Sequence, residues 1–194
     1  MAKLDDLPRV EITSRKAWRA WLKANHAKSG AVWAVTFKKP DPRHVPVSDI
    51  NEEALCFGWI DSLPRKLDDK RSMLLLAPRK PESAWSKINK ERAGRLIAEG
   101  QMEPAGHKVI DEAKASGTWS KLDGVEALEL PPDLTKAFAK SKAALKNFEA
   151  FPRSVKRGIL EWIIQAKKAE TRAARIAETV SKAKDNIRAN QWRQ

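Results

Sequence analysis

The side chains best suited to bind a charged ligand lie between Trp59 and Arg92. Asp61 stands in an otherwise apolar stretch, where a carboxylate must be either solvated or paired, because burying an unpaired charge is costly. Its expected partners are Arg65, Arg79 and Arg92. Two interpretations stay open: a buried Asp–Arg pair that fixes the geometry of the fold, and a carboxylate that faces a ligand.

The segment that ends at Arg92 is predicted to provide an anion site. We expect a helix with Ser83 as its N-cap, so that Trp85, Asn89 and Arg92 follow at i, i+4 and i+7 on one face. Arg79 and Ser83 lie at the start of that helix, where free N–H groups and the helix dipole favour an anion. The alternative is a structural role, with a core tryptophan, a capping serine and arginines that bridge loops. The residues predicted to bind a ligand are Trp59, Asp61, Arg65, Arg79, Ser83, Trp85, Asn89 and Arg92.

Other catalytic chemistries find little support in the sequence. The three histidines are scattered, and neither a His-x-x-x-His nor a Cys-x-x-Cys spacing is present for zinc. Cys56 lies between Leu55 and Phe57 without an adjacent base, which is typical of a buried structural thiol. Asp68 and Asp69 are expected in a solvated turn rather than at a Mg²⁺ ion. We therefore predict no catalytic residue, no metal and no cofactor, and favour a binding protein over an enzyme.

The elements that must position these residues follow from hydrophobic period and from turn residues. We expect strands over residues 31–38, 59–67 and 72–77, and helices over 14–26, from 48 to Gly58, 84–99 and 104–116, with further helices beyond 133. Strand alternation places Trp59, Asp61, Leu63 and Arg65 on one face. The predicted fold class is α+β, a small mixed β-sheet covered by helices, with a C-terminal helical extension.

The positive charge of the chain favours anionic partners. The net charge is +13, and residues 121–194 hold 16 Lys and Arg against 9 Asp and Glu. In the C-terminal helix a basic stripe faces away from the apolar side chains, and it could follow the phosphates of a nucleic acid. The alternative is a solvated helix face that keeps the protein in solution. The basic stripe consists of Lys168, Arg172, Arg175 and Lys182.

The sequence predicts a cytoplasmic protein without a transmembrane segment. The first residues lack the apolar stretch of a secretory signal, and the longest apolar runs, such as 73–77, are too short to cross a bilayer. Cys56 is the single cysteine and cannot form an internal disulfide, which fits a reducing compartment. The oligomeric state is not indicated.

Several segments read together resemble a known bacterial family. They are Ala54–Ser62, Arg65–Asp69 and Pro78–Arg92, followed by Gly100–Gly106 and Gly117–Trp119. They are similar to the YdeI/OmpD-associated family, also labelled bacteriocin-protection, over residues 12–120. The helices around Glu161–Ile163 resemble, more weakly, those often appended to this family. The resemblance implies a core over 12–120. Gly124, Pro131 and Pro132 indicate a linker over 121–133, and a basic helical extension is expected over 134–194.

The resemblance implies a stress-resistance or bacteriocin-protection type of protein, with no reaction or cofactor attached to the family. We therefore expect a non-enzymatic protein that binds a small anionic ligand between the 59–67 strand and the start of the 84–99 helix. One alternative is a nucleic-acid-binding protein that uses the basic C-terminal helices. Another is an enzyme that acts on a phosphorylated or carboxylated small molecule.

Overall fold

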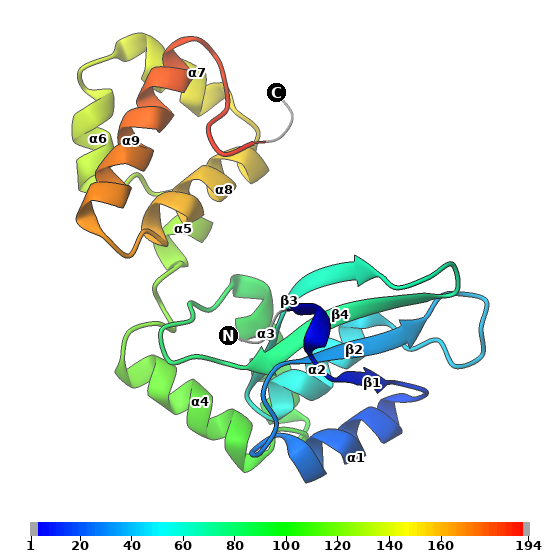
Figure 1. Cartoon of the computed structure of the whole chain (residues 1–194). Coiled ribbons are helices and arrows are strands. Elements are labelled where there is room, and N and C mark those ends of the chain that lie inside the picture. Colours follow the sequence, from blue (N-terminus) through cyan, green and yellow to red (C-terminus); the bar gives the residue numbers. More distant parts are fainter. Residues whose placement is uncertain (1–3, 192–194) are drawn as a thin grey trace. The chain divides into compact units, whose positions relative to one another are not determined.

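A computed structural model describes residues 4–191, which form two compact units divided between Trp119 and Ser120 (Figure 1). The first unit combines a sheet with helices, and the second consists of helices. This is the predicted α+β fold class with a mixed sheet. Among residues 4–191, no helix is both long and apolar enough to cross a membrane.

The first unit begins with a short 3₁₀ helix, η1. Ser14 caps the first α-helix as predicted, since its hydroxyl accepts from the Ala17 N–H at 3.1 Å. Trp18 and Leu22 are buried on the inner face of that helix. The elements are η1 (Leu4–Asp6), β1 (Arg9–Glu11), α1 (Arg15–Asn25), β2 (Val32–Phe37), α2 (Val47–Cys56), β3 (Trp59–Lys66), β4 (Arg71–Pro78), α3 (Lys87–Ala98) and α4 (Pro104–Ala115).

The sheet has the strand order β1-β2-β4-β3, with β1 parallel to β2 and the other neighbours antiparallel. The predicted turn between β3 and β4 is present, and Asp68 closes it by accepting from the N–H groups of Lys70 and Arg71. One face of the sheet packs with α1, α2, α3 and α4 in the main core. The other face carries a smaller cluster around Trp33, Val35 and Met73.

A bulge in β3 changes which residues share a face. Asp61 pairs with Leu76 but Pro64 pairs with Leu74, so β3 has one residue more than β4 across this interval. Because one extra residue reverses the alternation, Asp61 stays on the helix-covered face while Arg65 lies on the opposite face with Met73. The prediction that Asp61 and Arg65 share one face is wrong for this reason.

Two further elements differ from the sequence predictions. The helix expected over 84–99 begins only at Lys87, because Ser86 rather than Ser83 caps it, and its hydroxyl accepts from the Asn89 N–H at 3.4 Å. Trp85 therefore precedes α3 and does not share a helix face with Asn89. The short strand β1 was not predicted, because three residues carry too little periodicity to stand out.

The second unit is built from α5 (Asp123–Glu126), α6 (Pro132–Phe138), α7 (Lys142–Ala150), α8 (Arg153–Ile164) and α9 (Ala169–Lys184). Phe138 and Phe148 pack with ring centroids 5.1 Å apart. On α9, Ile176 and Ala183 are buried but Ala173 is exposed. The apolar side of this helix is therefore narrow. Helix α5 lies inside the segment predicted as a linker.

Candidate functional site

Arg79 is the one buried cation among residues 4–191, and only 7% of its surface is exposed. It follows β4 directly, and its backbone N–H donates to the Gly58 carbonyl oxygen at 2.9 Å. Its guanidinium carbon lies 3.9 Å from the ring centroid of Trp85. Its Nη1 donates to the carbonyl oxygens of Ala84 at 3.1 Å and Ser83 at 3.5 Å. The segment between β4 and α3 therefore wraps around the guanidinium.

Three buried nitrogen atoms of Arg79 and Trp85 lack a hydrogen-bond acceptor within residues 4–191. They are Nε and Nη2 of Arg79 and the indole Nε1 of Trp85, which is 1% exposed. An unpaired buried N–H donor costs about 1–3 kcal/mol, and more when the donor is charged. Such clusters are rare in folded proteins and call for an acceptor.

Burial lowers the pKa of Arg79 to about 10, and the negative charge of Asp61 acts in the opposite direction. Asp61 is half-buried on the helix-covered face of β3. Within the described part of the chain, however, no hydrogen bond or ion pair joins it to an arginine. The expected Asp–Arg pair is therefore absent as a direct contact, and Asp61 influences Arg79 through space.

Trp59 and Arg65 lie apart from this pair. The Trp59 side chain is buried in the main core, where it packs edge-on against Trp21 and its indole N–H donates to the His26 carbonyl oxygen at 3.3 Å. Arg65 forms an ion pair with Asp5 at 2.7 Å on the other face of the sheet. Both residues are accounted for structurally.

The remaining predicted site residues have separate roles. Ser83 accepts from Arg79 through the Ser83 backbone carbonyl and not through the Ser83 hydroxyl. Arg92 donates to the Asn89 side-chain oxygen at 3.3 Å, one turn away on α3. The structure therefore brings together Arg79, Ser83 and Trp85, adds Asp61 through its charge, and gives Asn89 and Arg92 contacts of their own.

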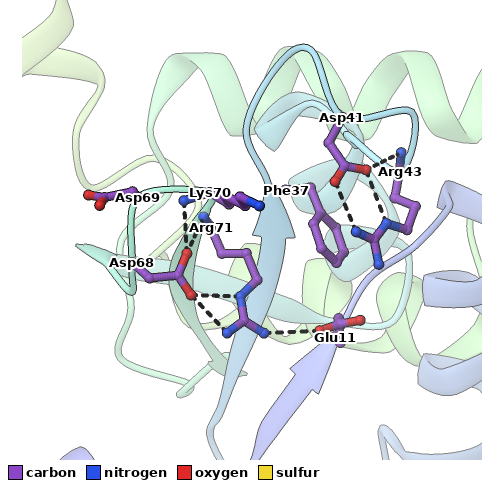
Figure 2. Close-up of a pocket in the computed structure, with 8 residues that line it drawn as sticks. All are labelled: Glu11, Phe37, Asp41, Arg43, Asp68, Asp69, Lys70 and Arg71. Atoms are coloured by element: carbon purple, nitrogen blue, oxygen red, sulfur yellow. Dashed lines mark hydrogen bonds and ion pairs between the residues drawn. The ribbon is translucent and has the colours of Figure 1, made fainter.

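A cavity of about 490 Å³ lies at the other end of the β3–β4 hairpin, beside the end of β2 (Figure 2). Asp41 holds Arg43 through both carboxylate oxygens, at 3.0 and 2.9 Å, whereas Asp68 holds Arg71 through Oδ2 alone, which lies 2.8 Å from both Nε and Nη2. These arginines lower the pKa values of Asp41 and Asp68. The lining residues are Glu11, Phe37, Asp41, Arg43, Asp68, Asp69, Lys70 and Arg71.

The cavity in Figure 2 was missed by sequence reasoning. The short spacings of Asp41 to Arg43 and Asp68 to Arg71 indicate local ion pairs, but their convergence depends on the order of the strands. Each guanidinium in the figure already has a carboxylate partner, so the charges are balanced internally. A charged ligand would have to replace one of these pairs, which makes Arg79 the better anchor.

A second cavity, of about 560 Å³, lies between α1, α2 and the turn before α4. Glu53, only 3% exposed, accepts from Arg15 at 2.6 Å and from Arg19 at 2.7 Å. Arg19 also binds Glu103 at 2.6 Å. Burial raises the pKa of the neighbouring Cys56 thiol, and the prediction of a buried cysteine is confirmed. This network joins secondary-structure elements and is structural.

Residues 10–109, just over half of the chain, match the family model described as a domain of unknown function, DUF8412. The chain belongs to this family. The DUF8412 match contains Asp61, Arg79 and Trp85 and extends into α4. It therefore includes the whole Arg79 site.

Residues 127–186 match a second family model, described as Bacteriocin-protection, YdeI or OmpD-Associated. The predicted resemblance is thereby confirmed, but the match lies on the helical unit and not on residues 12–120, where we placed it. It supports a protein of bacteriocin-protection type. Neither curated proteins nor solved structures gave a match to this DUF8412 chain.

The basic stripe of the YdeI/OmpD-associated segment is largely occupied by internal contacts. Arg172 binds Asp133 at 2.6 Å and lowers the pKa of that carboxyl group. Lys182 pairs with Glu178 at 2.8 Å. Arg175 lies over the Trp162 ring and donates to the backbone carbonyl of the same residue. Lys168, at the start of α9, is exposed. Among the residues described, no group of three His, Cys, Asp or Glu side chains could hold a metal ion.

Proposed function

We propose that this bacteriocin-protection type protein binds a small anionic ligand at Arg79 and acts as a binding protein rather than as an enzyme. The observation that carries the proposal is the set of three buried, unpaired donor atoms on Arg79 and Trp85. An anion supplies acceptors for these donors and a counter-charge for the buried guanidinium.

The ligand must enter through the segment that covers the guanidinium. Residues 80–86 connect β4 to α3 without regular structure, and Arg79 binds two of their carbonyl groups. Thr118 donates to the Pro81 carbonyl oxygen at 3.3 Å and fastens the segment to the end of α4. Opening has to separate Arg79 from these carbonyl groups and Pro81 from Thr118, while Trp85 holds the end of the segment in the core.

Thermal unfolding in the presence of anions tests this proposal. We expect acetate, phosphate or sulfate to raise the melting temperature of the first unit by a few degrees above sodium chloride at equal ionic strength. Arg79→Lys keeps the charge but loses the planar donor fork, so this variant should lose the response. Arg65→Lys is the matched control and should keep it, because Arg65 has its own carboxylate partner.

Two outcomes contradict the proposed function. One is a wild-type protein whose melting temperature none of the three anions raises above the chloride reference. The other is an equal anion response in the Arg79→Lys and Arg65→Lys variants. If Arg79→Lys proves poorly folded, the acetate response of the wild type decides, because sulfate and phosphate stabilise folded proteins without a specific site.

A cytoplasmic location also stays our proposal, and it rests on the single, buried Cys56. Cell fractionation that recovers the native protein from the envelope would contradict it. Nucleic-acid binding is not proposed as a second function, since Arg172, Arg175 and Lys182 already have internal partners.

A further inference from the structure

We infer that the ligand of Arg79 is a monoanionic carboxylate, held side-on by Nε and Nη2, and that the charge of Asp61 weakens the binding of dianions. This inference rests on the proposed function and assigns the ligand class of the same site.

The unpaired edge of the Arg79 guanidinium is complementary in shape to a carboxylate. Its Nη1 is used by backbone carbonyl groups of residues 83 and 84, whereas Nε and Nη2 are unpaired. The N–H bonds of Nε and Nη2 point in the same direction along one edge of the planar group. Two parallel donors match the two oxygens of one carboxylate or phosphate group. The geometry thus selects an anion with two acceptors on one centre.

The indole of Trp85 favours a flat anion at this edge. The guanidinium lies over the Trp85 ring, and the faces of aromatic rings carry partial negative charge. A carboxylate bound side-on to the guanidinium lies in the plane of that group, with one oxygen on each donor. A tetrahedral phosphate projects further oxygens out of the plane. The unpaired indole N–H at the ring edge remains available to either anion.

The charges of Arg79 and Asp61 together favour the binding of a monoanion over that of a dianion. Asp61 is the charged group whose field acts on Arg79 among the residues described. A monoanion neutralises the guanidinium, whereas a dianion leaves an excess negative charge near the Asp61 carboxylate. Repulsion between like charges is strong where water is excluded, and Arg79 is almost fully buried. Asp61 is therefore a specificity-determining residue and not a ligand-binding one.

Titration of the full chain with acetate and with inorganic phosphate tests the inference, under mildly alkaline conditions where phosphate is mainly a dianion. The Trp85 indole N–H signal, identified by its loss in Trp85→Phe, reports binding in ¹H–¹⁵N spectra. We expect acetate to bind the wild type roughly tenfold more tightly than phosphate, and Asp61→Asn to strengthen phosphate binding roughly tenfold more than acetate binding. Asp69→Asn, at the turn at the far end of the hairpin, should leave the ratio of acetate affinity to phosphate affinity unchanged.

The outcomes distinguish this inference from the proposed function. Phosphate binding that is tighter than acetate binding in the wild type overturns the carboxylate assignment but leaves an anion site. An equal effect of Asp61→Asn on both anions overturns the selectivity role of Asp61. A Trp85 signal that moves with neither anion, in a folded protein, overturns the proposed function itself.

Discussion

Most of the arginine side chains described above have carboxylate partners. Arg15 and Arg19 share Glu53, Arg65 binds Asp5, and Arg172 binds Asp133. These guanidinium groups are about one-third exposed, so water still solvates part of each one. Arg79 differs in both respects, being buried and without a hydrogen-bonded carboxylate. A buried cation of this kind is a strong indication of binding, because stability alone does not favour it.

At the residue scale we predict that Glu53 stabilises the first unit. Glu53→Gln removes the charge that Arg15 and Arg19 share, and it should lower the free energy of unfolding by on the order of 3 kcal/mol. Glu91→Gln is the control, since its exposed pair with Lys87 contributes about 0.5 kcal/mol or less. Urea unfolding followed by far-ultraviolet circular dichroism measures both variants. Equal effects of the two substitutions would show that the Glu53 network is not structural.

At the element scale, periodicity and caps predicted the helices of the first unit and three of its four strands. Ser14 at the start of α1 and the Asp68–Lys70 turn are local signals, and both were correct. The predicted site residues lie together only in part, because two local details moved some of them. The cap of α3 is Ser86 rather than Ser83, and the β3 bulge separates Arg65 from Asp61. Tertiary packing decides which of two neighbouring serines caps a helix and where a strand bulges. The hydrophobic pattern of a sequence carries no information about that packing.

The bulge makes a prediction about deletions in β3. Removing Leu63 restores regular pairing while Asp61 stays opposite Leu76 and Arg65 opposite Met73, so the fold should survive with a melting temperature within a few degrees of wild type. Removing Ile60 instead turns Trp59 away from the core. That deletion should cost about 3–5 kcal/mol, as for the loss of a buried aromatic side chain.

Thermal melts of the two deletion variants provide the comparison. A Leu63 deletion that unfolds the protein as severely as the Ile60 deletion would contradict the pairing register described for β3. Similar small effects of both deletions would show that β3 can shift its register freely.

At the scale of the whole molecule, the two compact units correspond to two different family models. The DUF8412 match lies in the unit with the sheet, and the Bacteriocin-protection, YdeI or OmpD-Associated match lies in the helical unit. The sequence resemblance identified the second family but placed it on the first unit. The match to the bacteriocin-protection model thus lies on the helices, while the proposed anion site lies in the DUF8412 unit. Any account of the function must include both.

The titration of Arg79 in the full chain tests the central claim most directly. The ¹³Cζ chemical shift of its guanidinium is followed against pH, with and without saturating acetate, and Arg79→Lys identifies the signal. Burial disfavours the charged form, so the midpoint should lie near pH 10 in the free protein. A bound anion favours the charged form, so acetate should move the midpoint upward. A midpoint that saturating acetate leaves unchanged would contradict the proposed anion site.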